Sequence, residues 1–214
     1  MYNPKSKVYT NLLETAEIRW FLPGEIPEKM RAWFNGFDDF PPSSQTRTDH
    51  YLHLPGNAIG IKIREGLIEH KQGVDGVGEK WRSGTHSGKV EHWQKWSFPL
   101  VDYFAIAEML NTYTGSWLSI IKERQMRILS LDPTNRVLST SYEEVSGTAV
   151  GWELTKLKIE GSNDSRWTMG FESFGNDNKL TETLIKICNT ILADCPLKLT
   201  EEDCYSYPEL MCRV

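Results

Sequence analysis

The stretch that decides the fold is IGIKIREGLIEHKQ, residues 59–72. Apolar and charged residues alternate on both sides of Gly66, which is typical of two β-strands joined by a tight turn. The charged side chains of this predicted hairpin share one face: Lys62, Arg64, Glu69 and Lys71. Alternation alone leaves open whether that face meets water or lines a cavity.

The same alternation predicts further strands over residues 14–22, 47–54, 89–98, 117–129, 137–140, 148–159 and 167–174. Cations recur at matching positions of five strands: Arg19, Lys62, Arg64, Lys71, Lys95, Lys122 and Arg124. The opposite faces carry an unusual number of tryptophans for a solvent face: Trp20, Trp96, Trp152 and Trp167. In a closed barrel with helices outside, the charged faces would converge on the interior. We therefore predict a mainly antiparallel α+β fold, an eight-stranded barrel with flanking helices.

Helical spacing of apolar residues predicts helices over residues 26–34, 99–113 and 180–192. We expect a loop over residues 35–46 and a mobile, glycine-containing connection over 73–88, which either closes over an anion or is simply solvated. One domain is expected over residues 1–214, with the barrel core at about 14–192 and an irregular tail from Asp194 onward.

Composition limits the function classes. The chain has 214 residues and a formal net charge of −5, so its surface as a whole does not favour nucleic acid or an anionic membrane. It contains no apolar run of transmembrane length and begins without a signal-peptide pattern, which predicts a cytoplasmic protein with no membrane partner. The four cysteines form no C-x-x-C pair, and we expect them to be structural thiols. Neither a P-loop nor a Gly-x-Ser-x-Gly elbow is present.

In their order and spacing, the predicted strands resemble the CYTH-like fold, also called the triphosphate tunnel metalloenzymes. The resemblance rests on EIRWF (17–21), RTDHYL (47–52), IKIR (61–64), LIEHK (67–71), KER (122–124) and FESF (171–174). It implies an antiparallel tunnel with charged residues inside, which acts on inorganic triphosphate, thiamine triphosphate, RNA 5′ ends or ATP. It also implies Mg or Mn held by carboxylates, for which Glu17 and Glu172 are the matching positions.

The sequence departs from that family at the metal ligands. Arg19 stands where the first motif has its second Glu, Phe21 stands where it has Lys, and Phe174 replaces a second acid of the closing strand. A guanidinium about 4 Å from a divalent cation repels it by roughly 8 kcal/mol at an effective dielectric near 20. Arg19 could replace the cation electrostatically and bind phosphate, but it would not activate a metal-bound water.

Three functions follow from these residues. The first is binding of a phosphorylated or polyanionic small molecule, such as polyphosphate, by the seven interior cations. The second is a metal-dependent phosphohydrolase with a rearranged Mg or Mn site formed by Glu17, Glu69, Glu91 and Glu172. The third is a calycin-like barrel that binds an apolar or pigment ligand or a protein partner, which inward-pointing Trp93 and Phe21 would favour.

Overall fold

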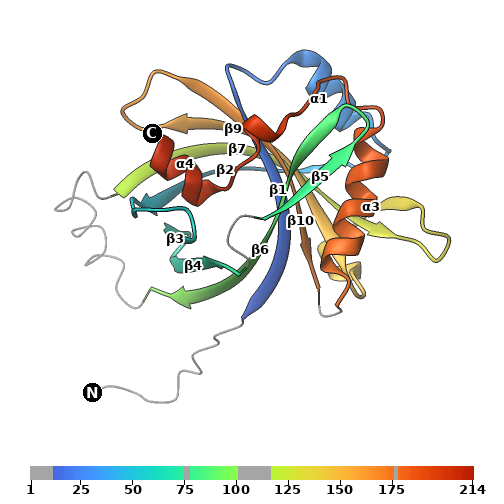
Figure 1. Cartoon of the computed structure of the whole chain (residues 1–214), viewed down its shortest axis with the longest axis horizontal. Coiled ribbons are helices and arrows are strands. Elements are labelled where there is room, and N and C mark those ends of the chain that lie inside the picture. The colour runs from blue at the N-terminus through green and yellow to red at the C-terminus, as the bar shows by residue number, and fades with distance from the viewer. Residues whose placement is uncertain (1–11, 75–77, 101–116, 176–177) are drawn as a thin grey trace.

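The computed structural model describes residues 12–74, 78–100, 117–175 and 178–214. Its longer strands are β1 (Leu13–Pro23), β2 (Ser43–Leu52), β3 (Ile59–Arg64), β4 (Leu67–Gly73), β6 (His86–Pro99), β7 (Trp117–Leu131), β9 (Ala149–Ile159) and β10 (Ser165–Phe174). They pair antiparallel in the order β1-β10-β9-β7-β2-β3-β4-β6, and β6 pairs with β1, which closes the barrel (Figure 1). The predicted eight-stranded antiparallel barrel is confirmed.

The hairpin over residues 59–72 forms as its alternation indicates. Ile63 pairs with Ile68 and Lys62 with Glu69 across β3 and β4. Glu65 and Gly66 both have positive φ, 49° and 77°, which suits the two-residue turns whose twist matches that of the flanking strands. β2 starts at Ser43, earlier than expected, because Ser43 pairs with Met126 of β7. The helix predicted over 99–113 lies almost entirely outside the described residues.

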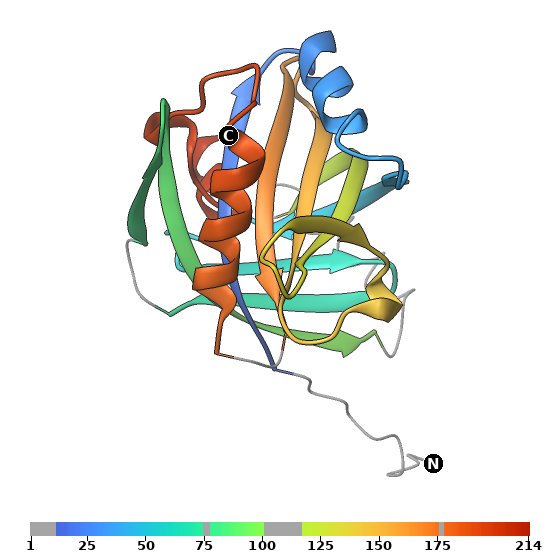
Figure 2. The ribbon, with the colours of Figure 1, turned by 90° about the vertical axis from the view of Figure 1, so that its right-hand side faces the viewer.

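Two helices cover the outside of the barrel (Figure 2). α1 (Glu28–Asn35) and α3 (Leu180–Leu192) contribute Met30, Phe34 and the apolar side of α3 to one large core. That core buries the outward-facing tryptophans Trp20, Trp152 and Trp167 completely. Because the apolar faces of β1, β9 and β10 are sealed by the helices, their charged faces point into the barrel.

The prediction of a mobile connection over residues 73–88 is wrong for the residues of this range that the structure describes. β5 (Glu79–Ser83) pairs with the start of β6 as a hairpin, which lies on the outside of the barrel. Trp81 packs edge-on against Trp20 at 6.0 Å between ring centroids and donates its indole N–H to Asn189 of α3. The glycines of this segment predict a flexible loop, but the packing of Trp81 against the outside of the barrel holds the segment in place.

The expectation of an irregular tail is wrong for its second half, whereas residues 194–200 form neither helix nor strand. Residues 201–213 form the 3₁₀ turn η2 (Glu201–Asp203) and the helix α4 (Tyr207–Arg213), which lies across one end of the barrel (Figure 1). Ser206 caps α4 by accepting a hydrogen bond from the amide of Glu209, and Pro208 occupies its first turn. In the described part of the chain, no helix combines the length and apolar character needed to cross a membrane.

Candidate functional site

One end of the barrel interior is apolar and filled. Phe21, Tyr51, Leu157 and Ile159 point inward there and meet side chains of the C-terminal segment. Phe21 stacks on Tyr205 at 4.7 Å, and the ring of Tyr207 lies parallel to that of Tyr51 at 5.4 Å. The barrel is therefore a cup closed by α4, with its opening at the end where β1 begins and β10 ends.

The middle of the interior is charged. The seven cations selected from the sequence lie here, and each forms an ion pair with a carboxylate. The pairs are Arg19 with Glu17 and Glu153, Lys62 with Asp49 and Glu69, Arg64 with Glu69, Lys71 with Glu17, Lys95 with Glu172, Lys122 with Asp49, and Arg124 with Glu153. The cations are thus already neutralised in large part by acidic neighbours, which lie on other strands except for Glu17 beside Arg19.

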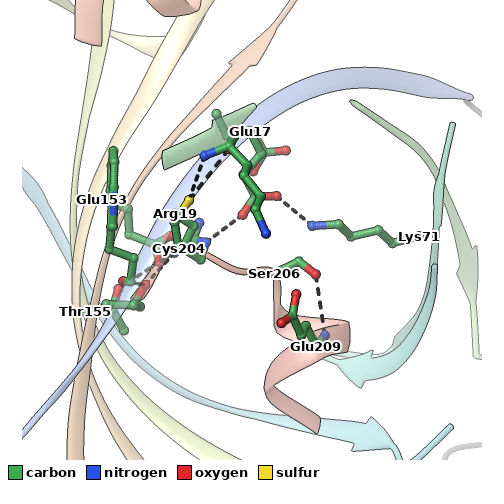
Figure 3. A network of polar contacts seen from close by, with 12 residues as sticks. Glu17, Arg19, Lys71, Glu153, Thr155, Cys204, Ser206 and Glu209 are labelled. Carbon is green, nitrogen blue, oxygen red and sulfur yellow. Dashed lines mark hydrogen bonds and ion pairs between the residues drawn. The ribbon is translucent and has the colours of Figure 1, made fainter. Parts of the chain in front are cut away.

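Arg19 is at the centre of this network. Its Nε donates to Glu17 at 2.6 Å and its Nη1 to Glu153 at 2.9 Å, while Lys71 reaches the other oxygen of Glu17 at 2.6 Å (Figure 3). The guanidinium lies against Gly170, where an added Cβ would come within 2.7 Å of Cζ. Glycine at position 170 therefore leaves the space that the Arg19 guanidinium occupies.

The pKa values of the central carboxylates reflect these contacts. Burial alone would raise the pKa of Glu17, but Lys71 and Arg19 outweigh it and lower that pKa well below its usual range. Burial also disfavours the charged form of Glu153. The positive charges of Arg19 and Arg124 outweigh this effect, so the pKa of Glu153 also lies far below its normal value. Both carboxylates are ionised at neutral pH and act as the fixed counter-ions of the guanidinium groups.

A second cluster surrounds Asp49, which is fully buried. Lys122 contacts it at 2.9 Å, Arg47 at 3.0 Å and Lys62 at 3.6 Å. Three cations therefore share one carboxylate, so positive charge exceeds negative charge at this point. Burial lowers the pKa of Lys122, and the nearby Asp49 carboxylate raises it, but burial dominates, so this pKa lies well below its usual value. A further anion close to Lys122 would favour the protonated amine and raise the pKa again.

The alternation of cations does not predict several of these residues. Asp49 lies inside the RTDHYL motif and Glu153 inside a predicted strand, but both are acidic and fall outside the cationic pattern. The usable signal was position along the strand, because Asp49 is two residues from Arg47 on the same face of its strand and Glu153 alternates with outward-facing Trp152. The contribution of Tyr207 had no sequence signal, since the tail carries no strand pattern.

An open cavity of about 180 Å³ leads from the charged centre to solvent. We call it the mouth cavity and define it by its lining residues: Leu13, Arg19, Arg124, Met126, Ile128, Tyr142, Gly151, Glu153, Glu172 and Phe174. Of the seven selected cations, Arg19 and Arg124 line it directly, and Lys95 contacts its wall through Glu172. Lys62, Arg64, Lys71 and Lys122 lie deeper or further round the barrel.

No protein-family model matches this chain, and no curated protein proves similar to it. The antiparallel closed barrel with an inward-facing charged lining agrees with the architecture that the CYTH-like resemblance implies. Membership of that family remains a prediction, since a barrel architecture is compatible with more than one family.

The carboxylates do not fit a divalent cation. Both oxygens of Glu17 and both oxygens of Glu69 accept from Lys or Arg, and Glu172 is paired with Lys95. Glu91 differs, because burial raises its pKa to about 7 despite nearby Lys71, so it is partly protonated at neutral pH. Among the described residues, no group of three or more His, Cys, Asp or Glu side chains is arranged to hold a metal ion. Mg or Mn would have to displace resident cations to reach the oxygen ligands it needs.

Manganese binding should depend on the charge at position 19. We expect Mn²⁺ to leave the melting temperature of the wild type unchanged, whereas Arg19→Glu, with three carboxylates at positions 17, 19 and 153, should be stabilised by Mn²⁺. Without metal this variant should lose roughly 3–5 kcal/mol of stability, and Mn²⁺ at 100 times its Kd should restore about 2.7 kcal/mol. Differential scanning fluorimetry with and without Mn²⁺ measures both effects.

Arg19→Gln is the matched control, since it removes the guanidinium without adding a carboxylate and should show no response to Mn²⁺. Stoichiometric binding of Mn²⁺ by the wild type that disappears in Glu17→Gln would contradict this account. Mn²⁺-dependent release of phosphate from tripolyphosphate would also contradict this account and would favour the hypothesis of a metal-dependent phosphohydrolase.

Proposed function

We propose that the barrel binds a phosphorylated or otherwise polyanionic small molecule, whose anionic group contacts Arg19 and Arg124 at the bottom of the mouth cavity. The observation that carries the proposal is the open cavity of about 180 Å³ that reaches these two guanidinium groups. Arginine presents five N–H donors in a planar fork, a geometry suited to phosphate oxygens.

Among the contacts between described residues, both arginines keep N–H donors for a ligand. The contacts of Arg124 with Glu153 and with Met126 use its Nε and Nη2. Those of Arg19 with Glu17, Glu153 and Thr168 use its Nε and Nη1. An incoming anion can therefore bind the remaining N–H groups while Glu153 keeps both arginines in position. The resident carboxylates act as a scaffold for the cations in this proposal.

The charge balance of the interior also supports an anionic ligand. Arg47, Lys62 and Lys122 share Asp49, and elsewhere in the interior burial raises the pKa of Glu91 to about 7, which lowers its negative charge. A buried excess of positive charge is costly, so an anion that enters relieves part of that cost. An anion also raises the pKa of Glu91, which is about 7, so its binding is accompanied by proton uptake at this carboxyl group near neutral pH.

We favour binding over the two alternatives for structural reasons. A hydrolase would need a free general base or a metal-bound water at the cavity. Glu17, Glu69, Glu153 and Glu172 are all held by cations. Glu91, whose pKa is about 7, does not line the mouth cavity. A calycin-like barrel would need a deep apolar cavity. Phe21 does point inward, but the apolar end of this barrel is filled by Tyr205, Tyr207, Leu210 and Met211. Trp93 also lies inside, under the ammonium group of Lys71 at 4.0 Å.

Isothermal titration calorimetry with sodium tripolyphosphate at low salt tests the proposal. We expect the wild type to bind and Arg124→Gln to bind about 10–100-fold more weakly, since a hydrogen bond to a charged group contributes roughly 1.5–3 kcal/mol. Arg136→Gln is the matched control, because Arg136 is a solvent-exposed arginine that pairs with Asp132 in the turn that follows β7. Arg64→Gln should have a smaller effect than Arg124→Gln, as Arg64 does not line the mouth cavity.

The absence of any binding by the folded wild type would overturn the proposal. Equal affinities of the wild type and Arg124→Gln would also overturn it, because the anion would then bind elsewhere. Affinity should fall steeply as salt is raised, since charge neutralisation drives the contact.

A further inference from the structure

The wall of the mouth cavity changes character between its floor and its rim. The floor consists of charged side chains from the barrel interior, Arg19, Arg124, Glu153 and Glu172. The rim is apolar and aromatic, and is formed by Leu13, Met126, Ile128, Tyr142 and Phe174. A ligand that fills this cavity must therefore offer an anionic group to the floor and an apolar surface to the rim.

The apolar rim is open to solvent. Leu13 is 41% exposed and Tyr142 is 67% exposed, although both border the cavity. The ring of Tyr142 stacks on that of Phe174 with 5.4 Å between centroids and 22° between planes. Tyr142 begins the 3₁₀ turn η1 (Tyr142–Glu144), which a capping box between Ser141 and Glu144 holds in place. Exposed apolar groups gathered around an opening are typical of ligand-binding clefts.

The charge of the floor is limited. Arg19, Arg124 and the Lys95 that pairs with Glu172 supply the cations, and Glu153 and Glu172 are their carboxylate neighbours. Glu17, which pairs with Arg19, and Lys71, which pairs with Glu17, add one charge of each sign. The cations therefore exceed the carboxylates by one charge at this floor. A phosphate monoester carries a charge of about −1.5 to −2 at pH 7, which is close to that excess, whereas a linear polyphosphate would bring several more negative charges against the carboxylates.

The size of the cavity fits a ring. A dry cavity of about 150 Å³ lined by apolar residues is known to hold a benzene-sized molecule, and the mouth cavity has about 180 Å³ with an open side. Gly151 leaves this space free, since a Cβ there would meet only Met126 Sδ at 3.7 Å and the carbonyl of Glu172 at 3.8 Å.

We propose that the mouth cavity selects a phosphate monoester of a compact, ring-sized apolar alcohol over an inorganic polyphosphate. The inference rests on the proposed function and specifies its ligand class. The phosphate binds the free N–H groups of Arg19 and Arg124, and the ring lies in the apolar rim against Phe174 and Tyr142. The ring removes the exposed rim from water, which a polyphosphate cannot do.

The test compares three probes by calorimetry: phenyl phosphate, methyl phosphate and sodium tripolyphosphate. Phenyl phosphate should bind the wild type at least tenfold more tightly than methyl phosphate, which shares its charge but lacks the ring. Phe174→Ala and Tyr142→Ala should each remove most of this preference and leave the affinity for methyl phosphate unchanged. Phe40→Ala is the control, because Phe40 is an exposed aromatic residue that does not line the cavity.

Filling the cavity provides a second variant that leaves every charged group in place. Gly151→Leu should abolish binding of phenyl phosphate, and Gly151→Ala, whose Cβ meets only ordinary contacts, should weaken it several-fold and fold normally. Near-ultraviolet circular dichroism checks that each variant is folded.

The outcomes separate this inference from the function on which it rests. If tripolyphosphate binds in an Arg124-dependent manner while phenyl phosphate binds no more tightly than methyl phosphate, the ligand class is wrong and the proposed function stands. If phenyl phosphate binds tightly but Phe174→Ala and Gly151→Leu have no effect, the site is wrong. If none of the three probes binds the wild type, both proposals are overturned.

Discussion

Replacing Asp49 by asparagine is expected to lower the free energy of unfolding by about 3–5 kcal/mol, the usual cost of removing one partner of a buried ion pair. The Asp49 carboxylate is fully buried and accepts contacts from Arg47, Lys62 and Lys122. Asparagine keeps the size of the side chain but leaves three cations around a neutral group. Mutual repulsion of these cations adds to the desolvation cost that the lost carboxylate no longer offsets.

Urea denaturation at pH 7, followed by tryptophan fluorescence, measures the effect. Burial opposes ionisation of Asp49, but Lys122 and Lys62 lower its pKa far below the normal value. A lowered folded-state pKa stabilises the protein above the unfolded pKa, about 3.9, and that contribution is lost as the pH falls toward the folded pKa. The stability gap between wild type and Asp49→Asn should therefore be constant above about pH 5 and shrink below pH 4.

Glu123→Gln is the matched control for this experiment. Glu123 lies on β7 next to Lys122, but its side chain faces outward and is exposed, so its substitution should change stability by less than about 0.5 kcal/mol. An Asp49→Asn variant as stable as Glu123→Gln would show that the three cations do not depend on this carboxylate.

Replacing Tyr207 by alanine is expected to destabilise the fold by about 3–5 kcal/mol, as for other large aromatic side chains in cores. The ring of Tyr207 is buried at the closed end of the barrel, stacked on Tyr51 and edge-on to Phe21. Its face also receives the ammonium group of Lys122 at 3.6 Å. Alanine would leave a cavity between α4 and the strands and remove this cation–π contact, which contributes about 2 kcal/mol when desolvated.

Tyr207→Phe separates the ring from the hydroxyl group. Within the described part of the chain, the buried Tyr207 hydroxyl has no hydrogen-bond partner. Removal of an unsatisfied buried polar group should leave stability unchanged or raise it by up to about 1–2 kcal/mol. Thermal unfolding of both variants measures the difference. A Tyr207→Phe variant that loses as much stability as Tyr207→Ala would mean that the hydroxyl, and not the ring, holds α4 in place.

The closed end has a functional consequence. In the part of the chain that the structure describes, α4 fills the barrel between Phe21 and Leu157, and the mouth cavity leads from the other end to the charged centre, so the proposed ligand would enter through the mouth cavity. The resemblance to tunnel enzymes implies a passage with two openings, whereas this chain forms a cup. The short, apolar-rimmed cup is consistent with a ligand smaller than a polyphosphate chain.

Much of the fold could be predicted from the sequence because it depends on local patterns. Strands β3 and β4, their turn at Glu65 and Gly66, and the helix α3 follow from alternation, turn chemistry and helical spacing. The seven cations were found for the same reason, since residues two apart on a strand share a face. Segments without a strong period, such as β5 and α4, were missed because long-range apolar contacts determine their structure.

The sequence by itself determined the eight longer strands to within a few residues and that cations gather on one face of five of them. Only the tertiary structure decided that this face lines the interior, because α1 and α3 cover the opposite face. It also decided the partners of the cations: Arg19 meets Glu153 across 134 residues of chain, through the pairing of β1 with β10 and of β10 with β9. Alternation is a local property with a period of two, whereas strand register and barrel closure are set by packing over the whole chain, and they alone bring opposite charges together.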